Sequence, residues 1–249
     1  MTDVRETCIN GRWVLRLPAH RAERPEWDIA NGGWEPERIT SMASILGPGD
    51  VLYDCGAEQG DMPGLFSSLG CDLVLIEPNP LAWPNIKCVW DANDLRPALA
   101  WWVGFASDTD YVPKRADVAF PFGTDGWPAC AYGEAIGATG FRHLAQEHDV
   151  TSQITLDSLA ARCGRPPTAI TIDVEGSELR VLKGSIGLLV KHKPIVWVSI
   201  HSDRVWMDEM YGGVDVGDVY AFMENYSYEG TFLAFDHEEH HVFRHPEGR

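Results

Sequence analysis

The segment that most constrains how this chain can fold is residues 51–61, where a short apolar run ends in an acid and passes directly into a glycine turn. Gly56 and Gly60 frame the turn, and the run before it has the length and composition of a buried parallel strand. A second apolar run, residues 72–76, ends at Glu77, 17 residues after Gly60. In nucleotide-binding α/β folds such a turn brings backbone close to a ligand, and an acid ending the next strand accepts hydrogen bonds from a ribose. The segment therefore predicts a nucleotide-type cofactor at one end of a parallel sheet.

Apolar runs of strand length alternate with helix-like segments along the rest of the chain. The predicted strands are residues 51–55, 72–76, 98–106, 168–172, 194–200, 231–235 and 241–244. The predicted helices are one that opens at Glu35 and ends before Gly47, and residues 62–69, 81–89, 155–162, 178–190 and 215–225. This alternation is typical of an α/β fold with a doubly wound, Rossmann-like sheet and right-handed crossovers. We therefore expect residues 1–249 to form a single domain of this class.

Two regions fall outside this alternation. Residues 1–33 are polar and irregular apart from the cluster Trp13-Val14-Leu15, so residues 1–46 are interpreted as an N-terminal extension and a helix. Residues 109–153 contain several prolines and glycines with little periodicity, and they are too many for a plain connection. We predict an insertion after strand three that covers one end of the sheet as a lid. Its aromatic side chains can line an acceptor site or pack the insertion onto the sheet: Phe120, Phe122, Trp127, Tyr132 and Phe141.

The composition excludes several partners and compartments. A formal net charge of −17 argues against binding to nucleic acid, because that affinity comes largely from cationic side chains on phosphates. The six cysteines form no CxxC pair, which favours free thiols in a reducing compartment. The N-terminus has no apolar signal core, and nowhere do 18 apolar residues run together. We expect a soluble cytoplasmic protein with no membrane partner, whose oligomeric state the residues leave open.

Two later motifs narrow the family. The first is Thr155-Leu156-Asp157-Ser158-Leu159, and the second is Ile172-Asp173-Val174-Glu175-Gly176-Ser177-Glu178, which continues to Lys183-Gly184. Together with the turn that begins at Asp54 and with Glu77-Pro78-Asn79-Pro80, they resemble the signatures of FkbM-type S-adenosylmethionine-dependent methyltransferases. The resemblance extends over residues 34–201, and the run that contains Asp173 is its most specific part.

The resemblance implies a sheet of seven strands whose last strand is antiparallel, with S-adenosylmethionine as cofactor. The turn residues approach the methionine end, Glu77 accepts from the ribose hydroxyls, and the residues after strand three lie near the adenine. The implied cofactor-binding residues are Asp54, Gly56, Ala57, Glu58, Gly60, Glu77, Pro78, Ser107 and Asp108. Two positions depart from the family pattern: Glu58 replaces the usual Asn, and Ser199 stands where an acid is common.

Three chain segments are expected to meet on the acceptor side of the same edge. Asp173 follows the fourth strand, His201 follows the fifth, and residues 236–240 join the last two strands. Methyl transfer to a hydroxyl needs a group that takes the proton, and a histidine that titrates near neutral pH is the natural choice. His201 is the first candidate for this base, and His237 and His240 are the next. The alternative is a solvated acidic hairpin with surface histidines.

The same cluster could instead hold a divalent cation that lowers the pKa of the acceptor hydroxyl. Asp173, His201, Asp236 and His237 are the candidate ligands. Carboxylates alone would suit magnesium, and added histidines would suit a transition metal. The residues do not choose between a base and a metal.

The sequence therefore predicts a methyltransferase that acts on a hydroxyl of a small molecule or glycan. A nicotinamide-dependent oxidoreductase is one alternative, but it would want glycine at position 58, where this chain has Glu58. A non-catalytic module that retains the sheet is the other, and Glu58 and Ser199 are the features that favour it.

Overall fold

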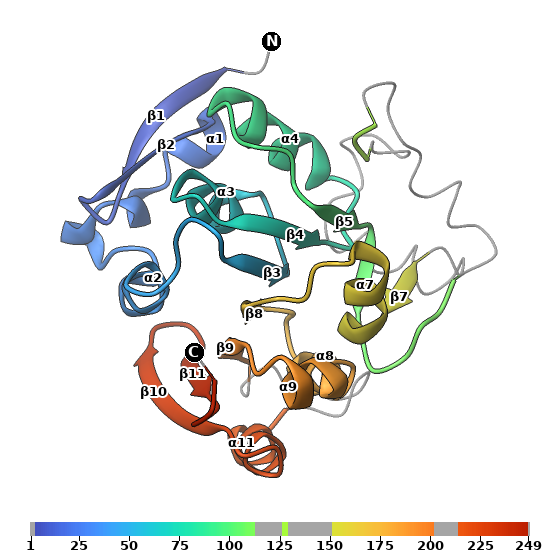
Figure 1. Cartoon of the computed structure of the whole chain (residues 1–249). Helices are drawn as coiled ribbons and strands as arrows, with labels where there is room; N and C mark the ends of the chain where they lie inside the picture. The colour runs from blue at the N-terminus through green and yellow to red at the C-terminus, as the bar shows by residue number, and fades with distance from the viewer. Residues whose placement is uncertain (1–2, 113–125, 129–150, 202–213, 249) are drawn as a thin grey trace.

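The computed structural model describes residues 3–112, 126–128, 151–201 and 214–248. Its largest feature is a seven-stranded sheet with the order β10-β11-β9-β8-β3-β4-β5 (Figure 1). Its strands are β3 (Val51–Cys55), β4 (Asp72–Ile76), β5 (Ala100–Trp102), β8 (Ala169–Ile172), β9 (Ile195–Ile200), β10 (Glu229–Phe235) and β11 (Glu239–Arg244). From β9 to β5 neighbouring strands pair in parallel, whereas β11 is antiparallel to both β9 and β10. The predicted doubly wound sheet with an antiparallel last strand is confirmed.

Helices cover both faces of the sheet, because its central strands are apolar on both sides. Leu52 on β3 packs into one core cluster and Tyr53 into the other, as alternation along a strand requires. One face is covered by α2 (Pro36–Ala43), α3 (Asp61–Ser68) and α4 (Trp83–Ala92). The other face is covered by α7 (Leu156–Cys163), α8 (Glu178–Lys183), α9 (Ile186–Lys191) and α11 (Val216–Glu224). The result is a three-layered α/β structure whose parallel strands all end at one edge.

The N-terminal region is more regular than its sequence predicts. The expectation that residues 1–33 are irregular is wrong, because β1 (Val4–Ile9) and β2 (Trp13–Pro18) form an antiparallel hairpin. Short helices follow it: α1 (Ala19–Ala22), η1 (Pro25–Trp27) and η2 (Ile29–Asn31). Alternate residues of β2 are buried, and β2 lies against α3 and α4 on the outside of the sheet layer (Figure 1). A half-buried strand in a polar sequence gives only a short apolar signal, which is why the hairpin was not predicted.

Strand three is shorter than predicted and divides into two pieces. β5 pairs with β4 in the main sheet, whereas β6 (Gly104–Ala106) leaves it and pairs in parallel with β7 (Ser152–Ile154). The two ends of the predicted insertion 109–153 are therefore joined beside the sheet. Most of that insertion lies outside the described residues, as do Phe120, Phe122, Tyr132 and Phe141. Trp127 is described, and it stacks on Trp101 of the strand β5 with ring centroids 4.9 Å apart.

The helix predicted over residues 178–190 is two helices, α8 and α9. The second one begins afresh because the Asp157 carboxylate accepts hydrogen bonds from the amides of Gly187 and Leu188, at 2.8 and 2.9 Å. A carboxylate at a helix N-terminus satisfies amides that have no partner within the helix. Thr155 acts in the same way on its own helix α7, where its hydroxyl accepts from the Ser158 amide. Two polar residues of the first motif thus hold helix ends.

The remaining expectations concern thiols and membranes. Within the described parts of the chain, Cys8, Cys55, Cys71 and Cys163 carry free thiols. Among the helices that the structure describes, none combines the length and the apolar character needed to span a bilayer.

Candidate functional site

The glycine turn after β3 has the conformation that its sequence predicts. Gly56 and Gly60 have φ values of +97° and +89°, a region that side chains rarely tolerate. A Cβ atom on Gly56 would lie 1.9 Å from the backbone oxygen of Asp173, and one on Gly60 would lie 2.9 Å from Cα of Ile86. Both glycines are therefore required by the protein itself, and not only by an approaching ligand. The amides of Gly56 and Ala57 are bound to the Ile76 carbonyl, which ties the turn to the end of β4.

Two buried acids stand beside this turn. Oε2 of Glu77 accepts from the Glu58 amide at 2.9 Å, and Oε1 accepts from the Asn79 amide at 2.7 Å. Burial raises the pKa of Glu77 to about 8, although these two amides oppose the shift. Asp54 is also buried, and burial raises its pKa to about 7. Oδ2 of Asp54 is buried and accepts no hydrogen bond from the described part of the chain.

Glu58, the departure from the family pattern, lies on the surface of the turn with its side chain 63% exposed. Its carboxylate lies 3.3 Å from Nη2 of Arg21, which comes from the N-terminal helix α1. Arg21 binds the buried Asp61 at the start of α3 more closely, with Nε donating at 2.8 Å. The N-terminal region therefore brings one cation to this turn, and the cation pairs with both acids.

The residues after strand three are partly engaged elsewhere. The Ser107 amide donates to the Ile154 carbonyl, and its hydroxyl donates to Asp108 at 3.2 Å. Asp108 also pairs with Arg180 of α8 at 2.9 Å. Pro78 is half-buried immediately after Glu77. Eight of the nine predicted cofactor-binding residues lie on the turns that follow β3, β4 and β6, and Asp54 lies within β3.

The acceptor side is organised around a buried arginine that sequence reasoning missed. Arg38, on α2, is only 2% exposed. Its Nη1 donates to Glu35 at 2.6 Å, to Asp173 at 3.0 Å and to Ser199 at 2.7 Å, while Nη2 donates to Thr171 at 2.6 Å. Burial raises the pKa of Asp173, but the charges of Arg38 and His201 outweigh this effect and hold it below its usual value. Arg38 thus keeps Asp173 ionised at the end of β8.

His201 ends β9 with its ring almost completely buried. Its Nδ1 lies 2.8 Å from Oε1 of Glu178, which also accepts from the Gly176 amide. Its Nε2 faces carboxylates: Asp173 at 3.6 Å, Glu238 at 3.6 Å and Glu175 at 3.9 Å. Burial lowers the pKa of His201. The hydrogen bond to the Glu178 carboxylate and the charge of Asp173 outweigh this effect and raise the pKa to about 9.

The hairpin between β10 and β11 reaches the same edge, as its parallel and antiparallel pairing predicts. His240 is buried, with Nδ1 2.9 Å from the Ser199 hydroxyl and Nε2 3.2 Å from Asp236. Burial and the nearby charge of Arg38 lower the pKa of His240 to about 4. His237 lies on the outside of the hairpin with its side chain 63% exposed, 2.9 Å from both Asp236 and Glu238.

Glu238 completes the cluster, and the sequence interpretation did not select it. Its side chain is 3% exposed. Its Oε2 forms no hydrogen bond with any described residue, since the nearby His237 ring is not in hydrogen-bonding geometry. Burial raises the pKa of Glu238 to about 8, and the charge of Asp173 adds to the shift.

Two groups of three side chains have ligand atoms close enough to share a metal ion. The first is Asp173, His201 and Glu238, and the second is Asp236, Glu238 and His240. Three of the four predicted metal ligands thus belong to these groups. His237 belongs to neither, and Glu238 belongs to both.

Some of the site residues that the sequence interpretation missed lie within motifs that it singled out, whereas others lie outside them. Glu178 is part of the second motif, and Glu238 stands within the hairpin segment, so both carried a signal. Glu35 and Arg38 looked like the polar start of a surface helix, and nothing local distinguishes them from one.

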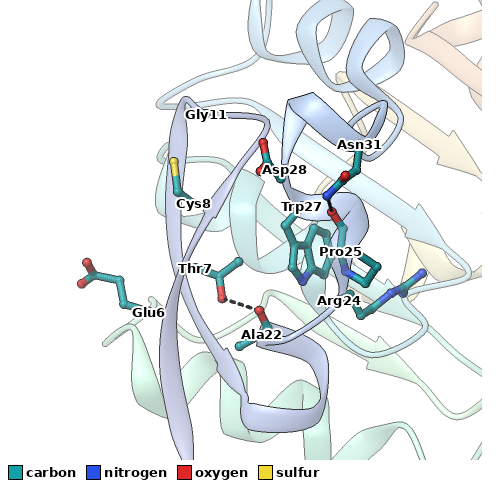
Figure 2. A pocket seen from close by; sticks show the side chains of 10 residues that line it. All are labelled: Glu6, Thr7, Cys8, Gly11, Ala22, Arg24, Pro25, Trp27, Asp28 and Asn31. Atoms are coloured by element: carbon teal, nitrogen blue, oxygen red, sulfur yellow. Dashed lines mark hydrogen bonds between the residues drawn. The ribbon is translucent and has the colours of Figure 1, made fainter.

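A surface pocket elsewhere on the molecule carries none of this chemistry. Figure 2 shows it on the N-terminal region, between β1 and the short helices, with Trp27 at its centre. Asn31 donates to the Pro25 carbonyl at 2.9 Å, and Thr7 donates to the Ala22 carbonyl at 3.4 Å. No residue from the carboxyl edge of the sheet lines this pocket.

Comparisons with known proteins agree with this architecture. The family model described as the methyltransferase FkbM domain matches residues 54–229. A crystal structure of methyltransferase FkbM from Methylobacillus flagellatus is similar, with a TM-score of 0.50 and 15% identity, over 79% of this chain and 43% of that one. This chain therefore spans less than half the length of that protein, and at this identity the likeness is one of fold.

Other solved structures are similar at lower scores. An rRNA methylase from Streptococcus thermophilus gives a TM-score of 0.49 at 7% identity, over 83% of this chain and 93% of that one. TYW2 from M. jannaschii, solved in complex with AdoMet, gives 0.46 at 10% identity, over 98% and 88%. A search among curated proteins returned no match.

Proposed function

Because this chain belongs to the FkbM methyltransferase family, we propose that it is an S-adenosylmethionine-dependent O-methyltransferase whose acceptor is a hydroxyl group of a small molecule or glycan. The family supports the cofactor and the transfer of a methyl group. The choice of oxygen as acceptor rests on the side chains at the carboxyl edge of the sheet. The family gives no support to the nicotinamide alternative.

The cofactor side fits S-adenosylmethionine in its chemistry. Each oxygen of Glu77 already accepts one amide and keeps a further lone pair for a ribose hydroxyl. Oδ2 of Asp54 is a buried acceptor that lacks a partner among the described residues. When bound, the cofactor supplies an electrophilic methyl group on a positively charged sulfonium. The acids along this edge favour that positive charge. Arg21 pairs with Glu58 and so reduces the negative charge near the expected methionine carboxylate.

One observation carries the choice of a hydroxyl acceptor: Nε2 of His201 faces the carboxylate cluster while Nδ1 is held by Glu178. A hydroxyl must lose its proton as its oxygen attacks, and His201 can accept that proton in its neutral form, which its pKa of about 9 makes the minor form at lower pH. Glu178 holds the His201 ring as a carboxylate orients a catalytic imidazole in other enzymes. This contact pre-organises Nε2 toward the acceptor. The same atom can alternatively bind a cation that makes the hydroxyl more acidic.

Two titrations and one product assay test this function. We expect isothermal titration to show binding of S-adenosylmethionine and no binding of NAD. Incubation with a library of hydroxylated acceptors should then release S-adenosylhomocysteine. His201→Ala should lower kcat by roughly 10²–10⁴ while cofactor affinity is retained, since a positioned proton acceptor contributes about that much. Cofactor binding without turnover on any acceptor would favour the non-catalytic alternative, and binding of NAD instead would contradict the proposal.

A further inference from the structure

We propose that Asp173, His201 and Glu238 bind one divalent transition-metal cation. The ligand atoms are a carboxylate oxygen from the end of β8, Nε2 from the end of β9 and a carboxylate oxygen from the β10–β11 hairpin. They lie within 4.8 Å of one another. The metal's role beside the acceptor hydroxyl rests on the proposed function, whereas its binding does not.

The distances match a site that is slightly open. Metal ligands at about 2.0–2.2 Å from an ion lie roughly 3–3.5 Å from one another, as follows from tetrahedral or octahedral angles. Nε2 of His201 lies 3.6 Å from Asp173 and 3.6 Å from Glu238, which is too far for a hydrogen bond. For these two pairs, shifts of a few tenths of an ångström would reach the spacing of metal ligands, and the two carboxylate oxygens lie within 4.8 Å of each other.

Glu238 is the independent observation that points to a ligand. The Glu238 side chain is only 3% exposed, and its Oε2 lies 3.6 Å from Nε2 of His201. Its Oε2 accepts no hydrogen bond from the described residues, although Nε2 of the exposed His237 lies 2.9 Å away outside hydrogen-bonding geometry. A buried carboxylate oxygen without a donor is costly, and a cation at this position would remove the cost.

The surroundings prepare His201 and Asp173 for this role. Glu178 holds Nδ1 of His201 at 2.8 Å, which directs the lone pair of Nε2 into the cluster. Such a carboxylate–histidine pair is the usual support of a metal-binding imidazole. Arg38 occupies Oδ2 of Asp173, whereas the contact with His201 uses Oδ1. His201 and Asp173 therefore each have one atom fixed by the protein and another directed at the cluster.

The ligand set selects the kind of metal. One imidazole with two carboxylates suits Mn²⁺ or Zn²⁺, whereas Mg²⁺ prefers oxygen ligands and water. Two carboxylates, together with an imidazole that releases its proton when the metal binds, also balance the charge of one divalent ion. The second group, Asp236, Glu238 and His240, is less suited, because its histidine already contacts Ser199 and Asp236 at hydrogen-bonding distances.

The test is titration of the chelator-treated full-length protein with MnCl₂ and with ZnCl₂, followed by calorimetry and by the thermal melting temperature. We expect one ion per chain and a saturable rise in Tm. Glu238→Gln, which keeps the shape of the side chain, should weaken binding at least tenfold and abolish the rise. Glu239→Gln is the matched control, since Glu239 is the next residue and faces His241 at 3.4 Å.

Several outcomes would overturn the site. They are a parent protein that binds neither metal, a Glu238→Gln variant that binds as tightly as the parent, or an equal loss in Glu239→Gln. If Glu238→Gln does not fold by circular dichroism, His201→Gln replaces it under the same criteria. A separate titration with S-adenosylmethionine distinguishes the two proposals. Cofactor binding without metal binding overturns only this site, and metal binding without cofactor binding overturns only the proposed function.

Discussion

The carboxyl edge of the sheet has two halves, which we name the cofactor half and the acceptor half after their proposed roles. The two halves stabilise their acids in different ways. On the cofactor half, Glu77 is held by the main-chain amides of Glu58 and Asn79. On the acceptor half, Glu35 and Asp173 are held by the Arg38 side chain, and Glu178 is held by His201. Main-chain donors leave the carboxylate free to accept further hydrogen bonds from neutral hydroxyls. Side-chain cations instead produce a region where positive and negative charges are interleaved.

This difference indicates different tasks for the two halves. The first is suited to recognising a neutral, hydroxylated group such as a ribose. The second is suited to holding a positive charge, whether a proton on His201 or a metal ion. The predictions below test the difference, beginning with the largest expected effect.

Removing the cation of the acceptor half should cost the most. Arg38→Met leaves two carboxylates, Glu35 and Asp173, uncompensated in a buried place, which typically destabilises a protein by about 3–5 kcal/mol. Urea denaturation followed by circular dichroism measures this loss. Glu35→Gln in the same chain should recover part of it, and Arg16→Met on the exposed face of β2 should change stability by about 0.5 kcal/mol or less. A loss for Arg38→Met no larger than that of the Arg16 control would refute a central role for this guanidinium.

On the cofactor half, the main effect should be on affinity. Glu77→Ala removes charge-assisted hydrogen bonds worth about 1.5–3 kcal/mol, so the Kd for S-adenosylmethionine should rise by about tenfold to a hundredfold. Isothermal titration gives the value directly. Asp91→Asn, at an exposed position of α4, is the control and should leave Kd unchanged. If Glu77→Ala binds as tightly as the parent, the ribose-binding role of the β4 end is wrong.

The buried state of Glu77 also predicts a pH dependence. Because burial raises the pKa of Glu77 to about 8, the carboxyl group is largely protonated below that pH in the free protein. Hydroxyl donors prefer the ionised form, so affinity for the cofactor should rise toward pH 8, by up to about tenfold per pH unit, and then level off. Titrations between pH 6 and 9 measure this, and Glu77→Gln should flatten the curve. An equally steep curve in Glu77→Gln would assign the titration to another group, with Asp54 the next to examine.

The smallest effect should come from restoring the family residue at position 58. Glu58→Asn removes an exposed acid near the expected methionine carboxylate, and Asn tolerates the φ of +44° found there. The pair with Arg21 is mostly exposed on the Glu58 side and worth about 1 kcal/mol or less. Cofactor affinity should therefore rise less than about fivefold, and the gain should shrink at high salt. A loss of affinity would instead identify Glu58 as a favourable contact.

The two halves also differed in how well the sequence predicted them. The cofactor half lies on two consecutive strand–turn units, so its residues form local motifs. The turn conformation at Gly56 and Gly60 was therefore predictable from the local glycine pattern. The acceptor half is assembled from five separate segments. His201 and Asp173 were predicted because each ends a strand, and strand ends meet at one edge.

Residues that reach the site from elsewhere had no such signal. Arg38 lies 135 positions from Asp173, and only the packing of α2 against the sheet brings them together. Glu238 and His237 are neighbours on one hairpin, and strand pairing alone could not tell which one faces inward. The β1–β2 hairpin was missed for the same reason, because its stability comes from contacts with α3 and α4.

The close approach of Gly56 to Asp173 has a consequence for how such an enzyme can change. The α-carbon of the cofactor turn packs against the backbone of the residue that begins the acceptor site, with no space for a methyl group between them. A substitution at position 56 would therefore disturb both halves at once, and neither selection nor an engineer can use it to adjust one alone. The hairpin that carries Glu238 and His240 lies at the sheet margin, where β9 and β8 separate β11 from β3. Under the proposed function, acceptor preference can therefore diversify at the margin while the centre of the sheet stays fixed.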